Sequence, residues 1–161
     1  MKPLSIADIF ESFTKKQLKH VSTPAFEGVE WEKLDFFSWH HVSGHISFVF
    51  YPMADRSIGI VLHKAKGTNK TCSVMFSWCL TIQRGNEISL YSSYVNDNPY
   101  NIVEDYVCKD LRCSLYLRKI LPLCANQMPE SLSIESRSIR LKQNLERFIS
   151  LVYPRQLADP K

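Results

Sequence analysis

Hydrophobic residues near both ends of the chain recur at the spacing of an α-helix. In the first segment, Ser5 stands three residues before Asp8, a pair that is typical of a capping box at a helix start. In the last segment, apolar positions form one stripe and basic residues occupy the opposite face. The pattern predicts a short N-terminal helix and a long amphipathic C-terminal helix. The apolar positions are Ile6, Ile9, Phe10 and Phe13 in the first helix, and Leu141, Leu145, Phe148, Ile149 and Val152 in the last.

Between these two helices, the chain changes to stretches rich in β-branched and aromatic residues, separated by clusters of turn-forming residues. This pattern predicts an antiparallel four-stranded meander. Before the meander, residues 31–39 carry a dense aromatic cluster, and we expect Trp39 at its end to be buried against the strands. After the meander, residues 109–121 have a helical pattern that stops at Pro122. The four predicted strands are residues 46–51, 58–65, 72–80 and 88–94.

Taken in order, these elements predict an α+β fold class. An antiparallel β meander is combined with an N-terminal helix, a hairpin-helix unit and a C-terminal amphipathic helix. The length of 161 residues, 45% of them hydrophobic, lies within the usual range of one domain with its own core. We therefore expect residues 1–161 to form a single domain.

The placement of apolar residues and cysteines predicts a soluble cytoplasmic protein. The sequence has no run of about 18 uncharged apolar residues, and Asp8 falls where a secretory signal peptide needs an apolar core. Cysteine occurs five times, an odd number at a density too low for a disulfide-stapled secreted scaffold. These cysteines are therefore expected to be thiols or metal ligands in a reducing cytosol.

Three cysteines have the placement expected of a treble-clef zinc site. Such a site takes two thiolates from a turn before a β-hairpin and two from the first turn of a following helix. Cys79 precedes the predicted hairpin, and Cys108 and Cys113 bracket a helix start, but Phe76 stands where the fourth ligand would complete Cys-x-x-Cys. The residues leave three interpretations open. Cys79, Cys108 and Cys113 bind zinc, with Cys72 as one candidate stand-in for the fourth ligand; the three are reduced core thiols; or the turn is hydrophobic and Phe76 occupies the volume of the metal.

The sequence does not favour an enzyme. Nucleophilic catalysis would need a thiol or hydroxyl beside a base, and no local motif pairs Cys79 or Cys108 with a histidine; no glycine-rich phosphate loop occurs either. His40, His41 and His45 lie close together, but no carboxylate accompanies them at a metal-binding spacing. A solvated turn is therefore the favoured interpretation of these histidines.

The net charge of +4 is small for a protein whose main task is to bind phosphates, and it permits an acidic partner. The C-terminal half is nevertheless rich in basic residues. One alternative is that this half binds ribosomal RNA or another nucleic acid, with Tyr94 or Tyr100 stacking on bases; the other is a solvated basic face on two helices. The basic residues are Lys109, Arg112, Arg118, Lys119, Arg137, Arg140, Lys142, Arg147 and Arg155.

Three segments of the sequence, taken together and in this order, are a combination specific enough to indicate a protein family. Residues 34–39 form an aromatic run that ends in Trp39, residues 105–116 contain the second cysteine pair, and residues 140–145 lie in the last helix. In these segments the chain resembles the FBP-type treble-clef domain shared with the FusB fusidic-acid resistance proteins, which bind elongation factor G. The resemblance covers nearly the whole chain. It implies a non-catalytic protein-binding domain that docks onto elongation factor G and promotes its release from the ribosome.

The resemblance also implies a contact surface. In FusB-like proteins the contact uses an aromatic residue beside the first cysteine, a basic residue before the second pair, a tyrosine two residues before that pair, and an aromatic residue in the last helix. Tyr106 and Phe148 match the last two positions, whereas Met75 replaces the first aromatic residue and Val103 replaces the basic one. We therefore expect the partner to contact Tyr106, Phe148, Met75 and the adjacent Phe76.

Overall fold

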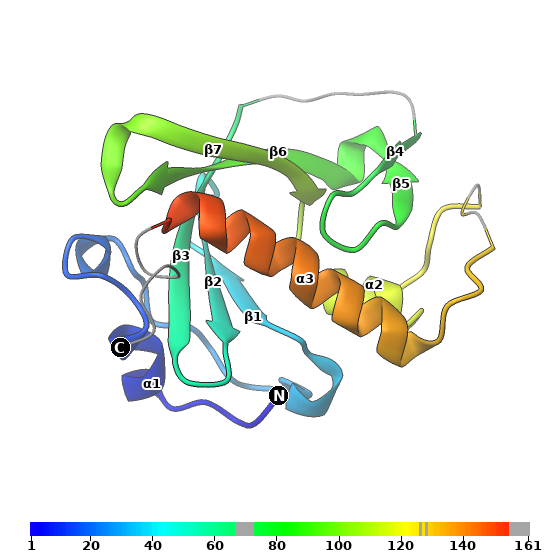
Figure 1. Ribbon diagram of the computed structural model, residues 1–161, viewed down its shortest axis with the longest axis horizontal. Helices are drawn as coiled ribbons and strands as arrows, with labels where there is room; N and C mark the ends of the chain where they lie inside the picture. Colours follow the sequence, from blue (N-terminus) through cyan, green and yellow to red (C-terminus); the bar gives the residue numbers. More distant parts are fainter. Residues whose placement is uncertain (67–72, 126, 128, 155–161) are drawn as a thin grey trace.

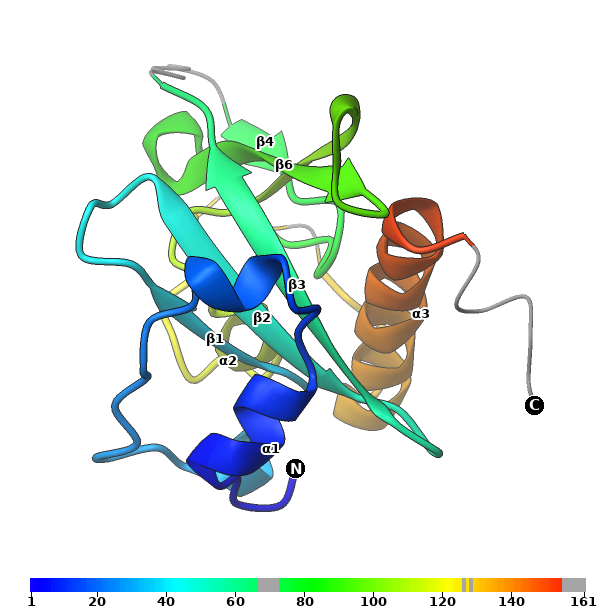
Figure 2. The ribbon, with the colours of Figure 1, turned by 90° about the vertical axis from the view of Figure 1, so that its left-hand side faces the viewer.

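A computed structural model of the protein describes residues 1–66, 73–125, 127 and 129–154. In this part of the chain, a five-stranded antiparallel sheet forms the centre of an α+β fold. Helix α1 (Ile6–Glu11) covers one face of the sheet, and the 19-residue helix α3 (Ile134–Val152) covers the other (Figures 1 and 2). The short helix α2 (Cys113–Leu117) packs against α3. The predicted fold class is confirmed.

The sheet has the strand order β1-β2-β3-β6-β7, and all neighbouring strands in it are antiparallel. Strands β4 and β5 form a separate antiparallel hairpin (Figure 1). The strands are β1 (Phe37–His40), β2 (Ile46–Pro52), β3 (Ser57–Lys64), β4 (Ser73–Met75), β5 (Ile82–Arg84), β6 (Ile88–Val95) and β7 (Asn98–Cys108). Short 3₁₀ helices occupy Gln17–Lys19, Trp31–Lys33 and Gly85–Glu87.

The sheet differs from the predicted four-stranded meander. In the described part of the predicted strand 72–80, only Ser73–Met75 is extended, and β3 pairs with β6 instead. Residues 98–108, for which the pattern predicted no strand, form the edge strand β7. Most side chains of β7 are exposed, so this strand lacks the alternation of buried and exposed residues that identifies a strand. The helix predicted at residues 109–121 is limited to α2 (Cys113–Leu117).

Both terminal helices begin at the caps that their sequences provide. The Asp8 amide donates to Ser5 Oγ over 3.2 Å, and the Ser5 amide donates to the Asp8 carboxylate over 2.7 Å. At the start of α3, the Ser136 amide donates to Ser133 Oγ over 3.2 Å. The apolar stripe of α3 is buried as predicted, at Leu141, Leu145, Phe148, Ile149 and Val152.

The side chains of β2 alternate between two hydrophobic cores, one on each face of the sheet. Val49 and Tyr51 belong to the core beneath α3, which we call the α3-side core. Phe48 and Phe50 belong to the core beneath α1, which we call the N-terminal core. The α3-side core also contains buried residues of α2 and α3, together with Cys79 and Cys108. The buried residues of the N-terminal core are Ile9, Phe13, Phe37, Phe48, Phe50 and Val61.

Trp39 packs on the strands but is only half-buried, so its observed burial is less complete than the sequence predicts. Its ring lies against Phe48 and Phe37, with ring centroids 5.1 and 5.5 Å apart. Its indole Nε1 donates to the Ser22 carbonyl over 2.8 Å. The polar edge of the indole therefore faces the connecting segment, and this keeps one side of Trp39 near the surface.

A buried carboxylate joins the aromatic segment to the two C-terminal helices. Asp35 is 5% exposed, and its carboxylate accepts two hydrogen bonds from the Arg118 guanidinium and one from the Ser138 hydroxyl. Its amide donates to Ser114 Oγ over 3.0 Å. Burial raises the pKa of Asp35, but the hydrogen bonds from Arg118 and Ser138 outweigh burial, so its pKa lies below the ordinary value. Asp35 is therefore held as a carboxylate in the folded protein.

Candidate partner-binding groove and thiol cluster

The turn that follows β4 carries Cys79 into the α3-side core. The Leu80 amide donates to the Phe76 carbonyl and the Phe76 amide donates to the Thr81 carbonyl, each over 3.0 Å. The turn places Leu80 in the left-handed region with a φ of 54°, which costs a non-glycine residue about 1–2 kcal/mol. The result is a tight turn in which Cys79 is only 4% exposed.

A second turn brings two more cysteines to the same place. Cys108 is the last residue of β7 and Cys113 is the first residue of α2. Between them, the Leu111 amide donates to the Cys108 carbonyl over 2.9 Å. The Cys108 Sγ lies 3.5 Å from the Cys79 Sγ and 3.3 Å from the Cys113 Sγ. The structure thus brings together the three cysteines that the sequence singles out, with their sulfur atoms within 4.8 Å of one another.

The three thiols differ in pKa because their surroundings differ. Burial disfavours a thiolate at Cys79, but hydrogen bonds from Cys108, Cys113 and Thr81 outweigh burial and hold the pKa of Cys79 well below its ordinary value. Burial raises the pKa of Cys108, and its hydrogen bonds with the other two thiols raise it further. Burial also raises the pKa of Cys113. Cys79 is therefore the most acidic thiol of the cluster.

The described residues supply three corners of a treble-clef zinc site. Zinc in such a site is surrounded by four ligands in a tetrahedron, with Zn–S distances of about 2.3 Å. Cys79, Cys108 and Cys113 form the group, and the described part of the chain adds no fourth Cys, His, Asp or Glu to it. Phe76, at the expected fourth position, is fully buried in the α3-side core. Cys72 lies outside the described residues. The described set therefore fits a three-thiolate site and does not fit a four-thiolate zinc site.

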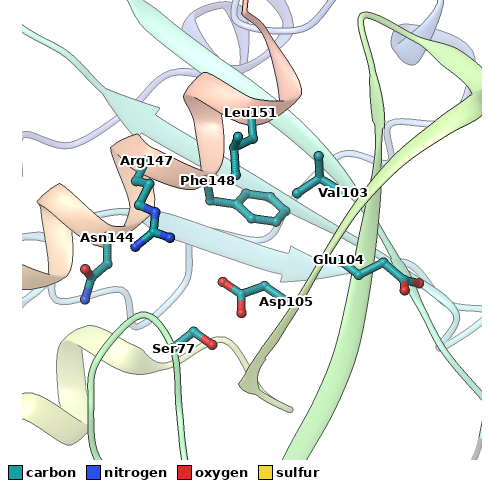
Figure 3. A pocket seen from close by; sticks show the side chains of 8 residues that line it. All are labelled: Ser77, Val103, Glu104, Asp105, Asn144, Arg147, Phe148 and Leu151. Carbon is teal, nitrogen blue, oxygen red and sulfur yellow. The ribbon is translucent and has the colours of Figure 1, made fainter.

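A groove lies between the C-terminal half of α3 and the edge strand β7 (Figure 3). Its volume is about 290 Å³. Phe148 on α3 points across the groove toward Val103 on β7, while Arg147 and Asp105 bring opposite charges to it (Figure 3). The groove thus combines an apolar floor with a charged rim. Its lining residues are Ser77, Val103, Glu104, Asp105, Asn144, Arg147, Phe148 and Leu151.

The four residues predicted to contact a partner lie in different environments. Phe76 is fully buried and Phe148 is 3% exposed, so both rings pack in the α3-side core, although Phe148 also lines the groove. Tyr106 is half-buried at the edge of the groove, where its carbonyl accepts from the amide of Ser77, a lining residue, over 3.0 Å. Met75 is 49% exposed at the end of β4. Of the four, Met75 and Tyr106 therefore offer the most accessible side chains.

The hydrophobic pattern of the sequence did not identify the exposed and charged residues that line the groove. Leu151 is 51% exposed and lies three residues after Phe148 on α3. Arg147 was assigned only to the polar face of the helix, and Asp105 comes from β7, which the pattern did not predict. The spacing of Phe148 and Leu151 was the one available signal, since residues three apart are neighbours on a helix surface.

The closely spaced histidines hold separate polar partners. The Nδ1 atom of His40 lies 2.7 Å from the Ser47 hydroxyl, and that of His41 lies 3.0 Å from the Ser43 hydroxyl. His45 is exposed in the same connection. Within the described ranges, no histidine belongs to a group that could hold a metal. His40 is the last residue of β1, so only His41 and His45 lie in the connection where the sequence predicts a solvated turn.

Some of the basic residues in the C-terminal half are paired with carboxylates. Arg118 pairs with the buried Asp35, and an Arg140 nitrogen lies 2.6 Å from a Glu130 oxygen. Arg155 lies outside the described residues. These ion pairs reduce the positive charge that this half of the chain offers to phosphate groups.

One family profile covers the part of the chain that contains both cysteine turns, Asp35 and the groove. The profile of the FBP C-terminal treble-clef zinc-finger family matches residues 5–152. The chain belongs to the FBP C-terminal treble-clef zinc-finger family. A comparison with curated protein sequences finds no match. In the residues that the structure describes, no helix of this FBP-family domain has the length and apolar character needed to cross a membrane.

The FBP-family fold also has a counterpart among solved structures. The chain is similar to the fusidic acid resistance protein FusC, with a TM-score of 0.62 and 15% sequence identity. The similarity covers 94% of this chain and 59% of the FusC chain. The domain therefore shares its fold with FusC and spans less than two thirds of the length of that protein.

Proposed function

We propose that this FBP-family domain is a non-catalytic, cytoplasmic binding module for a protein of the translation apparatus, elongation factor G in the first instance. Family membership and the fold shared with FusC support the proposal. The observation that carries it is the groove between α3 and β7. Phe148 lies on the floor of this groove, and the Tyr106 carbonyl accepts a hydrogen bond from Ser77, one of its lining residues. Both residues match contact positions of FusB-like proteins.

The chemistry of the groove indicates how a partner would be held. Phe148 and Val103 form an apolar floor, and the exposed side chain of Leu151 extends it. Arg147 and Asp105 provide charges of opposite sign beside this floor. Protein interfaces commonly combine an apolar centre with a polar rim, and a few central contacts supply most of the binding free energy. An apolar side chain of the partner would fill the floor, while its charged groups would pair with Arg147 and Asp105.

Binding without catalysis also fits the chemistry of the thiols. A cysteine nucleophile needs a base within hydrogen-bond reach. The described part of the chain places no histidine in the group formed by Cys79, Cys108 and Cys113, which are all buried. These thiols are therefore poorly arranged to attack a substrate, whereas the groove is open to another protein.

We also infer that the domain folds without four-thiolate zinc coordination. The inference rests on Phe76, whose side chain is fully buried at the position of the missing ligand. The expected outcome is that a zinc chelator leaves the melting temperature unchanged, because a structural zinc would make folding depend on the metal. Elemental analysis of protein purified without added metal provides the second measurement. Stoichiometric zinc held by four protein thiolates would contradict the inference.

Two substitutions on α3 test the groove directly. Leu151 lines the groove and is 51% exposed, whereas Ile139 is 56% exposed and does not line it. Because both side chains are largely exposed on the same helix, Leu151→Asp and Ile139→Asp should change stability by similar, small amounts. We expect Leu151→Asp to weaken binding to elongation factor G by about 2 kcal/mol or more, and Ile139→Asp to leave it nearly unchanged. Isothermal titration calorimetry measures both affinities.

Tyr106→Ala is the complementary test, because Tyr106 matches a contact position of FusB-like proteins. We expect a loss of affinity with a nearly unchanged melting temperature. If the unsubstituted domain has no measurable affinity for elongation factor G at tens of micromolar, the proposed partner is wrong. Binding to ribosomal RNA that weakens steeply as salt is raised would instead favour the nucleic-acid alternative, because salt suppresses counterion release.

A further inference from the structure

The three buried cysteines form a compact group of soft ligands. Cys108 lies at its centre, with sulfur-to-sulfur distances of 3.5 Å to Cys79 and 3.3 Å to Cys113. The two cysteine turns fix all three side chains, and none of the three is more than 4% exposed. Thiolates select soft metals, whereas carboxylates and carbonyl oxygens select hard ones. The group is therefore suited to a cation that accepts three sulfur ligands.

An aromatic residue stands at the sequence position where Cys-x-x-Cys would supply the fourth thiolate. Phe76 stands three residues before Cys79, and its carbonyl closes the same turn by accepting from the Leu80 amide. Its side chain is fully buried in the core that contains the three cysteines. A buried phenyl ring cannot donate to a metal. This arrangement disfavours zinc, which is almost always bound by four ligands in structural sites.

We propose that Cys79, Cys108 and Cys113 form a three-coordinate site for the soft monovalent cation Cu(I), in place of the tetrahedral zinc site of a treble clef. Each thiol that binds the cation releases its proton to the solvent, and no electron transfer is involved. Phe76 is then a specificity-determining residue: its apolar side chain excludes the fourth ligand that zinc requires.

A cavity lies beside the cluster. Cys79 lines this cavity, which has a volume of about 300 Å³. Lys119, Arg137 and Glu130 line it too, so a net positive charge lies beside a site that becomes negative when its thiols are deprotonated. An unpaired buried charge is costly. The two basic side chains therefore stabilise the deprotonated cluster that holds the cation.

The first test uses the unsubstituted protein, purified without metal and kept reduced and anaerobic. Cu(I) is titrated in competition with a chromophoric Cu(I) chelator, and zinc is titrated separately against a zinc chelator. We expect the protein to retain one equivalent of Cu(I), to develop a thiolate-to-copper charge-transfer absorption and to melt at a higher temperature. We expect it to yield zinc to the chelator. Retention of one equivalent of zinc, or failure to retain Cu(I), would overturn the proposal.

Substitutions identify the ligands. Cys108→Ser should abolish retention of Cu(I), because Cys108 is the nearest neighbour of both other thiols. Cys124→Ser is the matched control, since Cys124 is a half-buried cysteine outside the cluster. It should leave both retention and the charge-transfer band unchanged. Equal retention by Cys108→Ser and Cys124→Ser would show that the cluster is not the site.

Phe76→Cys tests the proposed cause of the selectivity. The substitution restores Cys-x-x-Cys, so we expect this variant to retain one equivalent of zinc that the parent protein releases. Cys72→Ser examines the one cysteine that lies outside the described residues. We expect it to bind Cu(I) as the parent does. If the parent retains zinc and Cys72→Ser loses it, Cys72 is the fourth ligand and the three-coordinate proposal is wrong.

Discussion

The two faces of the sheet are covered by cores that differ in composition and in completeness. The α3-side core contains aliphatic and aromatic side chains from most of the chain, together with the three thiols. The N-terminal core is dominated by aromatic rings, most of which meet edge to face or tilted, as Phe13 and Phe48 do at 6.2 Å, while Phe37 and Trp39 are stacked. Trp31 and Trp39 at its border are only half-buried. Among the described residues, four partly buried hydrophobic residues border the α3-side core and nine border the N-terminal core, so the α3-side core is the more closed of the two.

The two cores also differ in the features that they support. The α3-side core positions the groove, the thiol cluster and the buried carboxylate of Asp35. The N-terminal core closes the opposite face of the sheet and adds no metal-binding group among the described residues. Substitutions on the α3 side should therefore cost more stability than comparable substitutions on the N-terminal side. Four measurements sharpen or break this comparison.

The largest effect is expected at Asp35. Asp35→Ala leaves the Arg118 guanidinium without its carboxylate in a largely buried site, where the Arg118 side chain is 17% exposed. Loss of one partner of a buried ion pair typically costs about 3–5 kcal/mol, and we expect this cost in urea unfolding at pH 7. Glu130→Ala is the control, because it removes the carboxylate partner of Arg140 at a more accessible site. Such pairs contribute about 0–1 kcal/mol. Equal costs would contradict the assigned role of Asp35.

The contribution of Asp35 should also depend on pH. Its pKa is lower in the folded protein than in the unfolded chain, where an aspartate has a pKa of about 3.9. Its stabilising effect is therefore complete well above pH 4 and is lost as the pH falls through the lower folded-state pKa. We expect the difference in unfolding free energy between the parent and Asp35→Asn to shrink from pH 7 toward pH 2. A difference that stays constant would mean that Asp35 acts only through packing.

A smaller effect is expected at Trp39 in the N-terminal core. Full removal of a buried tryptophan costs about 3–5 kcal/mol, and the half-burial of Trp39 places Trp39→Ala near the lower end of that range. Trp39→Phe keeps a ring against Phe48 and loses the hydrogen bond to the Ser22 carbonyl, so it should recover most of the stability. Chemical denaturation compares the three proteins. A cost at Trp39 above that at Asp35 would reverse the comparison of the two cores.

The parts of the fold that the sequence predicted are those with strong local signals. The two terminal helices repeat apolar residues at helical spacing, and the predicted cap at Ser5 begins the first of them. The grouping of Cys79 with Cys108 and Cys113 followed from the known geometry of a treble clef. In both cases, the residues whose spacing led to the prediction are the residues that form the predicted structure.

The remaining parts depend on contacts that no local pattern contains. Strand β7 is an edge strand, so neither of its faces needs the regular apolar alternation of a central strand. The groove forms only because α3 returns to lie beside β7, which places Arg147 near Asp105 (Figure 3). The buried role of Asp35 depends equally on Arg118, 83 residues away. These features arise from tertiary structure and become visible only in the folded chain.

The smallest effects are expected at the helix caps, where the two faces can be compared with matched substitutions. Ser133 caps the 19-residue helix α3, and Ser5 caps the six-residue helix α1. Removal of an N-cap hydroxyl typically costs about 1 kcal/mol, and we expect this cost for Ser133→Ala, because α3 covers the closed core along its length. Ser5→Ala should cost less, since the first turn of a short peripheral helix can fray while Ile9 stays buried. Thermal and urea unfolding of the two variants measure the difference. A larger cost at Ser5 would mean that α1 anchors the sheet more firmly than α3 does, and the assignment of the closed core as the main source of stability would then be wrong.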